Sequence, residues 1–113
     1  MFDSVSFVAM NSALDGLSLR QRTIADNVAN IQTPGFLAGK VTFEDALRSA
    51  VNDGTGAATG TTTRSLAPTR EDGNNVDLET ETLLNIETNL RYQVATQAVS
   101  GHFSSLRTAM KSS

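Results

Sequence analysis

The chain has 113 residues, a net charge of −3 and no cysteine. A chain of this length forms one domain at most, and five Phe, one Tyr and no Trp supply little material for a large core. The negative charge and the scattered Lys and Arg residues argue against a nucleic-acid partner. The absence of cysteine excludes disulfides, thiolate chemistry and cysteine-ligated metal sites.

The first residues of the sequence do not have the pattern of a secretory signal or of a membrane span. Asp3 stands where a signal peptide would carry positive charge, and the apolar residues are interrupted too often for its hydrophobic region. No stretch approaches the roughly 20 apolar residues that cross a bilayer. We therefore expect no cleavable signal and no membrane-spanning segment.

The N-terminal segment has a helical pattern, which predicts a helix over residues 4–31. Spacings of four and three alternate along it, as in a heptad seam. The seam positions are Met10, Leu14, Leu17, Gln21, Ile24, Val28 and Ile31. Gln21 is the polar exception, and a polar residue in such a seam often fixes register. Thr33-Pro34-Gly35 is expected to end the helix, because Pro disfavours helical geometry in the residue before it.

The middle of the chain contains fewer apolar residues. A short helix is predicted from Phe43 to about Val51, with Glu44 and Asp45 in its first turn, where the helix dipole favours acids. Residues 52–63 then read NDGTGAATGTTT, with no apolar side chain larger than Ala. Such a stretch buries too little surface to offset its ordering entropy, so we expect a loop that is flexible in the isolated chain.

The C-terminal segment predicts the longest helix, over residues 77–110. Its apolar residues form two stripes. One contains Leu83, Ile86, Leu90 and Val94, and the other contains Tyr92, Ala95, Val99, Phe103, Leu106 and Met110. A pair of helices leaves part of these stripes uncovered, and uncovered apolar stripes usually indicate a partner.

The expected fold is therefore all-α. Residues 1–113 form one domain, in which two long terminal helices make a coiled-coil-like pair. A short helix and an irregular Gly/Thr-rich middle, within residues 32–76, join them. This layout favours self-assembly or a helical complex.

No constellation predicts catalysis. His102 is the only histidine and is interpreted as a surface or interface residue, because catalysis needs a positioned partner. Glu79, Glu81 and Glu87 are interpreted as complements of the helix dipole and as a solvated face. The glycines of DGTGAATG match no phosphate loop. We expect no enzyme activity, no cofactor, no metal and no small-molecule substrate.

Residues 19–36, LRQRTIADNVANIQTPGF, resemble the N-terminal signature of the bacterial flagellar axial proteins. The matching positions are Asn27, Ala29, Asn30, Thr33, Pro34, Gly35 and Phe36. The two asparagines lie on one helix face and are poor helix formers, so they are expected to bond to neighbouring backbone or to another subunit. Gly35 is expected to adopt a positive φ, and Phe36 to anchor the next segment on a helix of the same or a neighbouring subunit.

A second stretch, EDGNNVDLETE at residues 71–81, leads into Leu90-Arg91-Tyr92-Gln93 and narrows the resemblance. It is similar to the type B subunits of the proximal rod. Its motif positions are Asp72, Gly73, Asn74, Asn75, Val76 and Asp77. Type C, the other small proximal-rod subunit, is the alternative within the family. A cytosolic helical adaptor or export chaperone would explain the stripes but not the signature.

The resemblance implies a structural subunit that assembles with copies of itself and with other flagellar rod proteins. It also implies contact with the MS-ring adaptor protein and the export gate, export through the flagellar type III apparatus, and residence in the periplasmic rod. We expect the seam and part of the C-terminal stripes to pack between subunits. The C-terminal positions are Leu83, Ile86, Leu90, Val94, Val99, Phe103, Leu106 and Met110.

Overall fold

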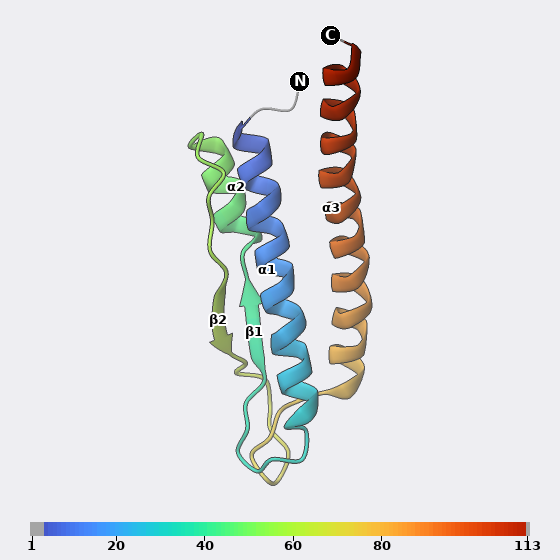
Figure 1. Cartoon of the computed structure of the whole chain (residues 1–113). Coiled ribbons are helices and arrows are strands. Elements are labelled where there is room, and N and C mark those ends of the chain that lie inside the picture. Colours follow the sequence, from blue (N-terminus) through green and yellow to red (C-terminus); the bar gives the residue numbers. More distant parts are fainter. Residues whose placement is uncertain (1–3, 113) are drawn as a thin grey trace.

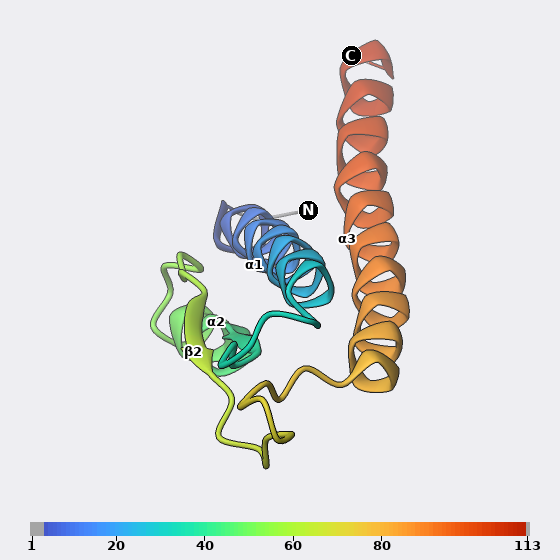
Figure 2. The same cartoon turned by 90° about the horizontal axis from the view of Figure 1, so that it is seen from below.

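The computed structural model describes residues 4–112, without the side chains of His102 and Ser112, as an elongated molecule of 66 × 26 × 15 Å. Helix α1 (Ser4–Ala29) and helix α3 (Leu78–Ser112) run antiparallel along its length (Figure 1). A thin layer made of helix α2 (Glu44–Asn52) and two strands covers the other side of α1. Helix α1 therefore lies between α3 and this layer (Figure 2).

The end of α1 differs from the expected one. The helix ends at Ala29 rather than at residue 31. The Asn30 N–H is shared between the carbonyls of Asp26 and Asn27, at 3.1 Å each, and the Asn30 side chain donates to Asp26 O at 2.8 Å. The last turn thus loosens before Pro34 is reached, and Pro34 does not itself define the end of the helix.

Helix α3 begins one residue later than expected and continues two residues beyond residue 110. Asp77 caps it, because its side chain accepts the Glu79 N–H at 3.0 Å and its carbonyl accepts the Glu81 N–H at 2.9 Å. Glu79 and Glu81 lie in the first turn, where carboxylates complement the helix dipole.

The expectation of an all-α fold is wrong in one respect. The chain is mostly helical, but strands β1 (Gly39–Thr42) and β2 (Thr61–Arg64) form an antiparallel two-stranded sheet. β-Branched threonines fit an extended, pleated backbone, and three of them form β2. The Gly/Thr-rich middle is therefore not wholly irregular, although its flexibility in solution stays a prediction. The coiled-coil character of the α1–α3 pair also stays a prediction.

The core is small and lies where the three layers meet. Leu17 from α1 packs with Val41 and Phe43, and Tyr92 from α3 lies against the same cluster. A Cβ on Gly16 would stand 2.5 Å from the Phe43 ring, so only glycine lets the ring approach α1 this closely. In residues 4–112, no helix combines the length and the apolar character needed to cross a membrane.

Candidate assembly site

The N-terminal seam is largely occupied inside the chain. Leu17 and Ile24 are buried, and Gln21 donates to Asn89 Oδ1 on α3 at 2.8 Å. Val28 is exposed, and three further seam positions are half-buried. These three are Met10, Leu14 and Ile31. Only the margins of the seam are therefore open to another subunit.

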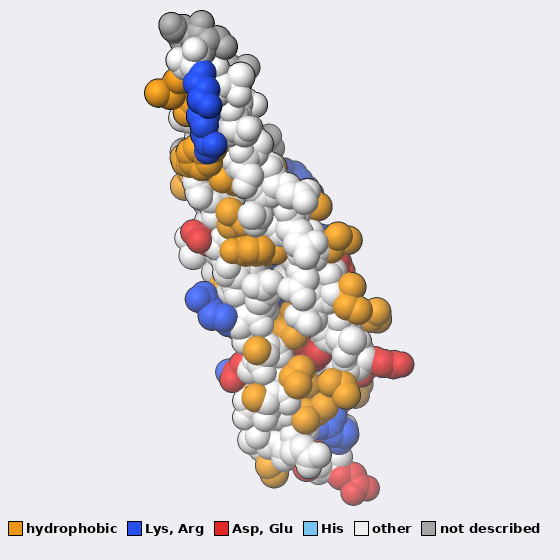
Figure 3. Space-filling view, turned by 45° about the vertical axis from the view of Figure 1, so that its right-hand side comes forward, with side chains coloured by type: hydrophobic (Ala, Val, Ile, Leu, Met, Phe, Trp, Pro, Cys, Tyr) orange, Lys and Arg blue, Asp and Glu red, His pale blue; other side chains and the backbone are white. Residues whose placement is uncertain are grey.

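The two apolar stripes of α3 face in different directions. Tyr92 and Ala95 face the core, on the same side of the helix as buried Thr88. The other stripe lies roughly on the opposite side at 100° per residue. Its members, here called the outer stripe, are Leu83, Ile86, Leu90 and Val94, which are 60–67% exposed. Figure 3 shows hydrophobic side chains along the side of the molecule that carries α3.

The C-terminal half of α3 is partly covered. The Phe103 ring meets the Phe7 ring edge to face, with centroids 5.8 Å apart and planes at 85°. Val99 is half-buried, while Leu106 and Met110 are exposed. This part of the helix contacts the beginning of α1 through Phe103, whereas all four residues of the outer stripe are at least 60% exposed.

The two sequence motifs meet at the end of the molecule where α1 ends and α3 begins. We call Asn27, Asn30, Asn74 and Asn75 the polar junction. Asn74 is fully buried and donates to the carbonyls of Asn30 and Thr33 at 2.8 and 2.9 Å. Its Oδ1 accepts the Val76 N–H at 2.7 Å. One side chain thus satisfies three backbone groups that no regular element pairs.

Asn75 and Asn27 act in the same way on the strands. Asn75 Oδ1 accepts the Ala38 N–H at 2.7 Å, just before β1. Asn27 Oδ1 accepts the Gly39 N–H at 2.7 Å, and its Nδ2 donates to Gly39 O at 2.9 Å. The Asn27 amide therefore pairs with the edge of β1 much as another strand would. The motif asparagines bond to backbone of their own chain, one of the two roles expected of them.

Glycines let the two motif turns lie against each other. Gly35 and Gly73 have φ of 75° and 84°, a region that other residues seldom adopt. The Gly35 N–H donates to Asp72 O at 2.8 Å. A Cβ on Gly73 would stand only 3.2 Å from Gly35 Cα. The expected positive φ at Gly35 is confirmed, and the turn packs against its own chain.

One expectation about the motifs needs correction, and one stays a prediction. The Arg64 guanidinium of β2 lies over the Phe36 ring, 5.3 Å from its centroid, and the anchoring of Phe36 on a helix of the same or a neighbouring subunit stays a prediction. Glu81 is not on a solvated face: it is 4% exposed and accepts from Asn27 Nδ2 at 3.0 Å. The remaining motif positions Ala29, Thr33, Pro34 and Asp72 are exposed.

Sequence reasoning missed the arginines that hold the layers together. Arg70 donates to the carbonyls of Val76 and Ile31 at 2.7 and 2.6 Å, which closes the polar junction. Arg20 forms a two-pronged bond to Glu44 at 2.7 and 2.9 Å. Arg20 lies 24 positions from Glu44, and Arg70 lies 39 positions from Ile31, so no local pattern in the sequence indicated these two contacts.

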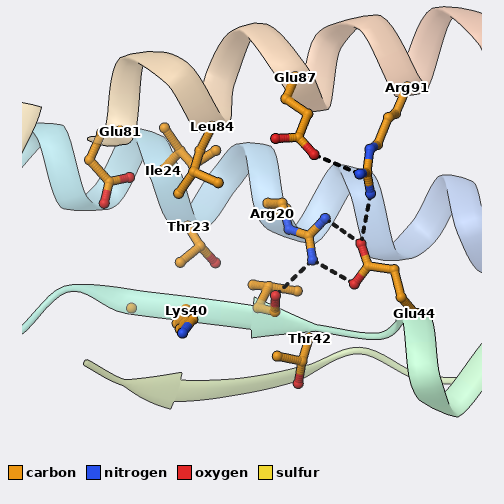
Figure 4. A pocket seen from close by; sticks show the side chains of 12 residues that line it. Arg20, Thr23, Ile24, Lys40, Thr42, Glu44, Glu81, Leu84, Glu87 and Arg91 are labelled. Atoms are coloured by element: carbon orange, nitrogen blue, oxygen red, sulfur yellow. Dashed lines mark hydrogen bonds and ion pairs between the residues drawn. The ribbon is translucent and has the colours of Figure 1, made fainter. Parts of the chain in front are cut away.

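A pocket of about 410 Å³ lies between β1, α1 and α3, and an ion-pair chain crosses it (Figure 4). Arg91 contacts Glu44 at 3.2 Å and Glu87 at 2.6 Å, so it joins α2 to α3. The hydrogen bond from Arg20 lowers the pKa of Glu44 to about 2. The same bond raises the pKa of Arg20 above its ordinary value. These charged groups pair with one another and hold α1, α2 and α3 together.

Glu81, at one side of this pocket, is the exception to charge pairing. Among residues 4–112 its Oε2 is the one buried side-chain nitrogen or oxygen without a hydrogen-bond partner. Burial raises the pKa of Glu81, although the bond from Asn27 opposes the shift and the charge of Asp77 adds to it. Within the described residues, no group of three or more His, Asp or Glu side chains is placed to hold a metal ion.

Comparison with known proteins agrees with this arrangement. Residues 9–36 match the family model described as "Flagella basal body rod protein". Rod proteins from Borrelia hermsii and Aeromonas hydrophila, both named "Flagellar basal body rod protein FlgB", are 35% and 32% identical to this chain. The alignments cover 87% and 88% of this chain, and 90% and 87% of the two relatives. The protein of the same name from Escherichia coli K12 is 29% identical, with 88% of both chains covered.

The family match and these relatives show that the chain is a component of the flagellar basal body rod. The identity to the relatives over nearly the full chain decides between the two small subunit types. The chain belongs to the FlgB family of flagellar basal body rod proteins.

Proposed function

We propose that this chain is a proximal-rod subunit that packs helically against copies of itself and other rod proteins through the outer stripe of α3. The observation that carries the proposal is the exposure of Leu83, Ile86, Leu90 and Val94, which are 60–67% exposed in one row along α3. Covering a large apolar side chain contributes about 1.5–3 kcal/mol when burial is complete. Four partly exposed side chains in one row would thus stabilise a subunit contact appreciably.

In the assembled rod, the chain would link the MS ring and the export gate to the distal rod. Its partners would be the MS-ring adaptor protein, the export gate and neighbouring rod subunits, and the chain would reach the periplasm through the flagellar type III apparatus. The polar junction supports this role indirectly, because it fixes where α3 leaves the turn and hence where the outer stripe points.

The proposal is tested by Ile86→Asp. Ile86 is 60% exposed, so the charge should leave the monomer folded but be buried unpaired in a packed rod. We expect an unchanged urea midpoint, loss of motility, and basal bodies without a rod in electron microscopy. Thr96→Asp adds the same charge at an exposed position off the outer stripe and should preserve motility. Normal rods built from the Ile86→Asp protein would refute the packing role.

A further inference from the structure

One apolar side chain outside α3 is exposed almost completely. Leu66 lies in the loop after β2 and is 95% exposed. This loop, residues 65–70, lies toward the end of the molecule where α1 ends and α3 begins (Figure 1). Single exposed leucines are common on protein surfaces, so exposure by itself assigns no role.

The backbone on both sides of Leu66 is held from inside the molecule. Asn75 Nδ2 donates to Ser65 O at 3.0 Å and to Ala67 O at 3.1 Å. The Ser65 N–H donates to Ala38 O at 2.8 Å. A buried amide of the sequence motif therefore fixes a loop whose one large apolar side chain points into solvent. A loop that is already fixed loses little backbone entropy when its side chain binds.

The same chain contains a groove whose lining suits an apolar side chain. An apolar groove of about 420 Å³ lies between α1 and α3. Its lining includes Met10, Ala13, Leu17, Leu90, Val94 and Ala98. Two of these residues belong to the outer stripe, so the groove continues the surface proposed for packing. At 1.5 Å per residue along α1, the groove lies roughly 25 Å from the end that carries Leu66.

We propose that Leu66 of one copy inserts into the apolar groove between α1 and α3 of a second copy. This contact rests on the proposed function and names the surface through which successive copies meet. The charged groups at the rim, Glu44 and Arg91, are paired with each other, and loop residues 65–69 carry no charge. A neutral loop therefore faces a neutral groove, and no charge is buried without a partner.

The two halves of this contact lie on different parts of the molecule. A contact between unlike surfaces does not form a symmetric dimer; when repeated with a shift along the long axis, it builds an open helical array rather than a closed ring. Neighbouring copies would be staggered along the long axis by roughly the distance between loop and groove. Asn75 of the polar junction holds the loop that carries Leu66, and Leu66 makes the contact through which successive copies would be added.

Because the chain has no cysteine, the contact can be trapped by disulfide formation. Purified Leu66→Cys protein is mixed with tagged Ala98→Cys or tagged Ala13→Cys protein and oxidised at high protein concentration. We expect the mixed disulfide to exceed either homodimer at least fivefold. The same mixture oxidised in urea gives the ratio of mixed disulfide to homodimers expected for random pairing. Thr96 is exposed and lies outside the groove, so Leu66→Cys mixed with Thr96→Cys should give a ratio close to the random one.

The proposal would be overturned if neither Ala98→Cys nor Ala13→Cys gave more mixed disulfide than the same mixture gives in urea. A predominant Leu66→Cys homodimer would overturn it as well. Rod formation by the Ile86→Asp protein is scored separately. If that variant builds no rods and the mixed disulfide is absent, the packing role of the outer stripe stands and the Leu66 contact falls. A second readout adds Asn75→Ala to the Leu66→Cys protein, which frees the loop without further change at position 66 and should lower the mixed disulfide severalfold.

Discussion

At the scale of single residues, the asparagines of the polar junction replace regular backbone pairing. The segments between α1 and β1 and between β2 and α3 are irregular, and their buried backbone groups need partners. Asn74 and Asn75 supply both donors and acceptors from one short side chain each. Asp or Ala would remove the donors, and Gln would place its amide one bond farther out. The side-chain chemistry thus explains why this residue type stands at these positions.

Replacing Asn74 by Ala should lower the free energy of unfolding by about 2–4 kcal/mol. The change leaves the buried Val76 N–H without its partner, which costs about 1–3 kcal/mol before relaxation. The carbonyls of Asn30 and Thr33 each lose one bond and keep the turn bonds from the Thr33 and Phe36 N–H groups, and each lost bond costs about 0.5–1.5 kcal/mol. Urea unfolding followed by circular dichroism measures the loss. Asn85→Ala, at an exposed helical position, should change stability by less than about 0.5 kcal/mol. Equal midpoints for the two variants would show that the junction is not structural.

Two glycines allow a matched test of backbone conformation. Gly35→Ala should destabilise the chain by about 1 kcal/mol, because Gly35 has a φ of 75° although a Cβ there would contact nothing within 4 Å. Gly101→Ala, in the interior of α3 with equally open space, should stabilise it by about 0.5–1 kcal/mol. Thermal melting of the two variants should therefore shift in opposite directions. A shift of the same sign would mean that the turn tolerates a side chain.

The sequence allowed some of these residue roles to be predicted and concealed others. The spacing of Asn27 and Asn30 and the poor helix propensity of both indicated bonding to neighbouring backbone or to another subunit, and the glycine after Pro34 indicated a positive φ. Both follow from local chemistry. The burial of Glu81 could not be inferred, because a carboxylate in the first turn of a helix ordinarily faces water. Its position depends on where Asn27 lies in the folded chain.

At the scale of elements, side chains of α1 bind the small sheet and α2 to the helix. Arg20 donates to Val41 O at 2.8 Å while its guanidinium bonds to Glu44. Together with Asn27, it occupies the edge of β1 that β2 leaves free. Such covering protects an edge strand from pairing with other chains. The sheet escaped prediction because each strand has only four residues, and its partner on the open edge is a pair of side chains.

Glu81 makes the attachment of α3 sensitive to pH. A carboxyl whose pKa is raised by folding stabilises the folded state below its ordinary value, 4.5, and loses that contribution as the pH rises through its folded pKa. Glu81→Gln should therefore be more stable than the unaltered chain at pH 7, and the difference should shrink toward pH 4.5. Urea midpoints of both proteins at the two pH values measure it.

The carboxyl of Glu44 affects the stability of the fold in a separate pH range. Its pKa is lowered to about 2, so its contribution is present above pH 4.5 and is lost as the pH falls through about 2. Both proteins keep Glu44, and its effect cancels in their difference. Glu79→Gln, at an exposed position of the same first turn, should show no comparable gain at pH 7. A Glu81→Gln protein that is less stable than the unaltered chain at pH 7 and no less stable at pH 4.5 would contradict the account.

At the scale of the whole molecule, the chain divides its apolar surface between folding and assembly. The N-terminal seam and the inner face of α3 are used within the chain, while the outer stripe is left exposed. Periodicity predicted both long helices and both stripes of α3. It did not indicate which stripe faces inward, because that choice depends on the layer of α2 and the strands on the far side of α1.

The chemical reactivity of one cysteine on the outer stripe tests the central claim most directly. Leu83→Cys should react rapidly with a maleimide in the purified monomer, since Leu83 is 67% exposed. In isolated basal bodies the account predicts labelling at least tenfold slower, because a neighbouring subunit covers the outer stripe. Arg48→Cys on α2, whose native side chain is 75% exposed, reports the reactivity of a cysteine away from α3 in the same preparations. Labelling of Leu83→Cys at the monomer rate in assembled rods would contradict the claim that α3 packs through this surface.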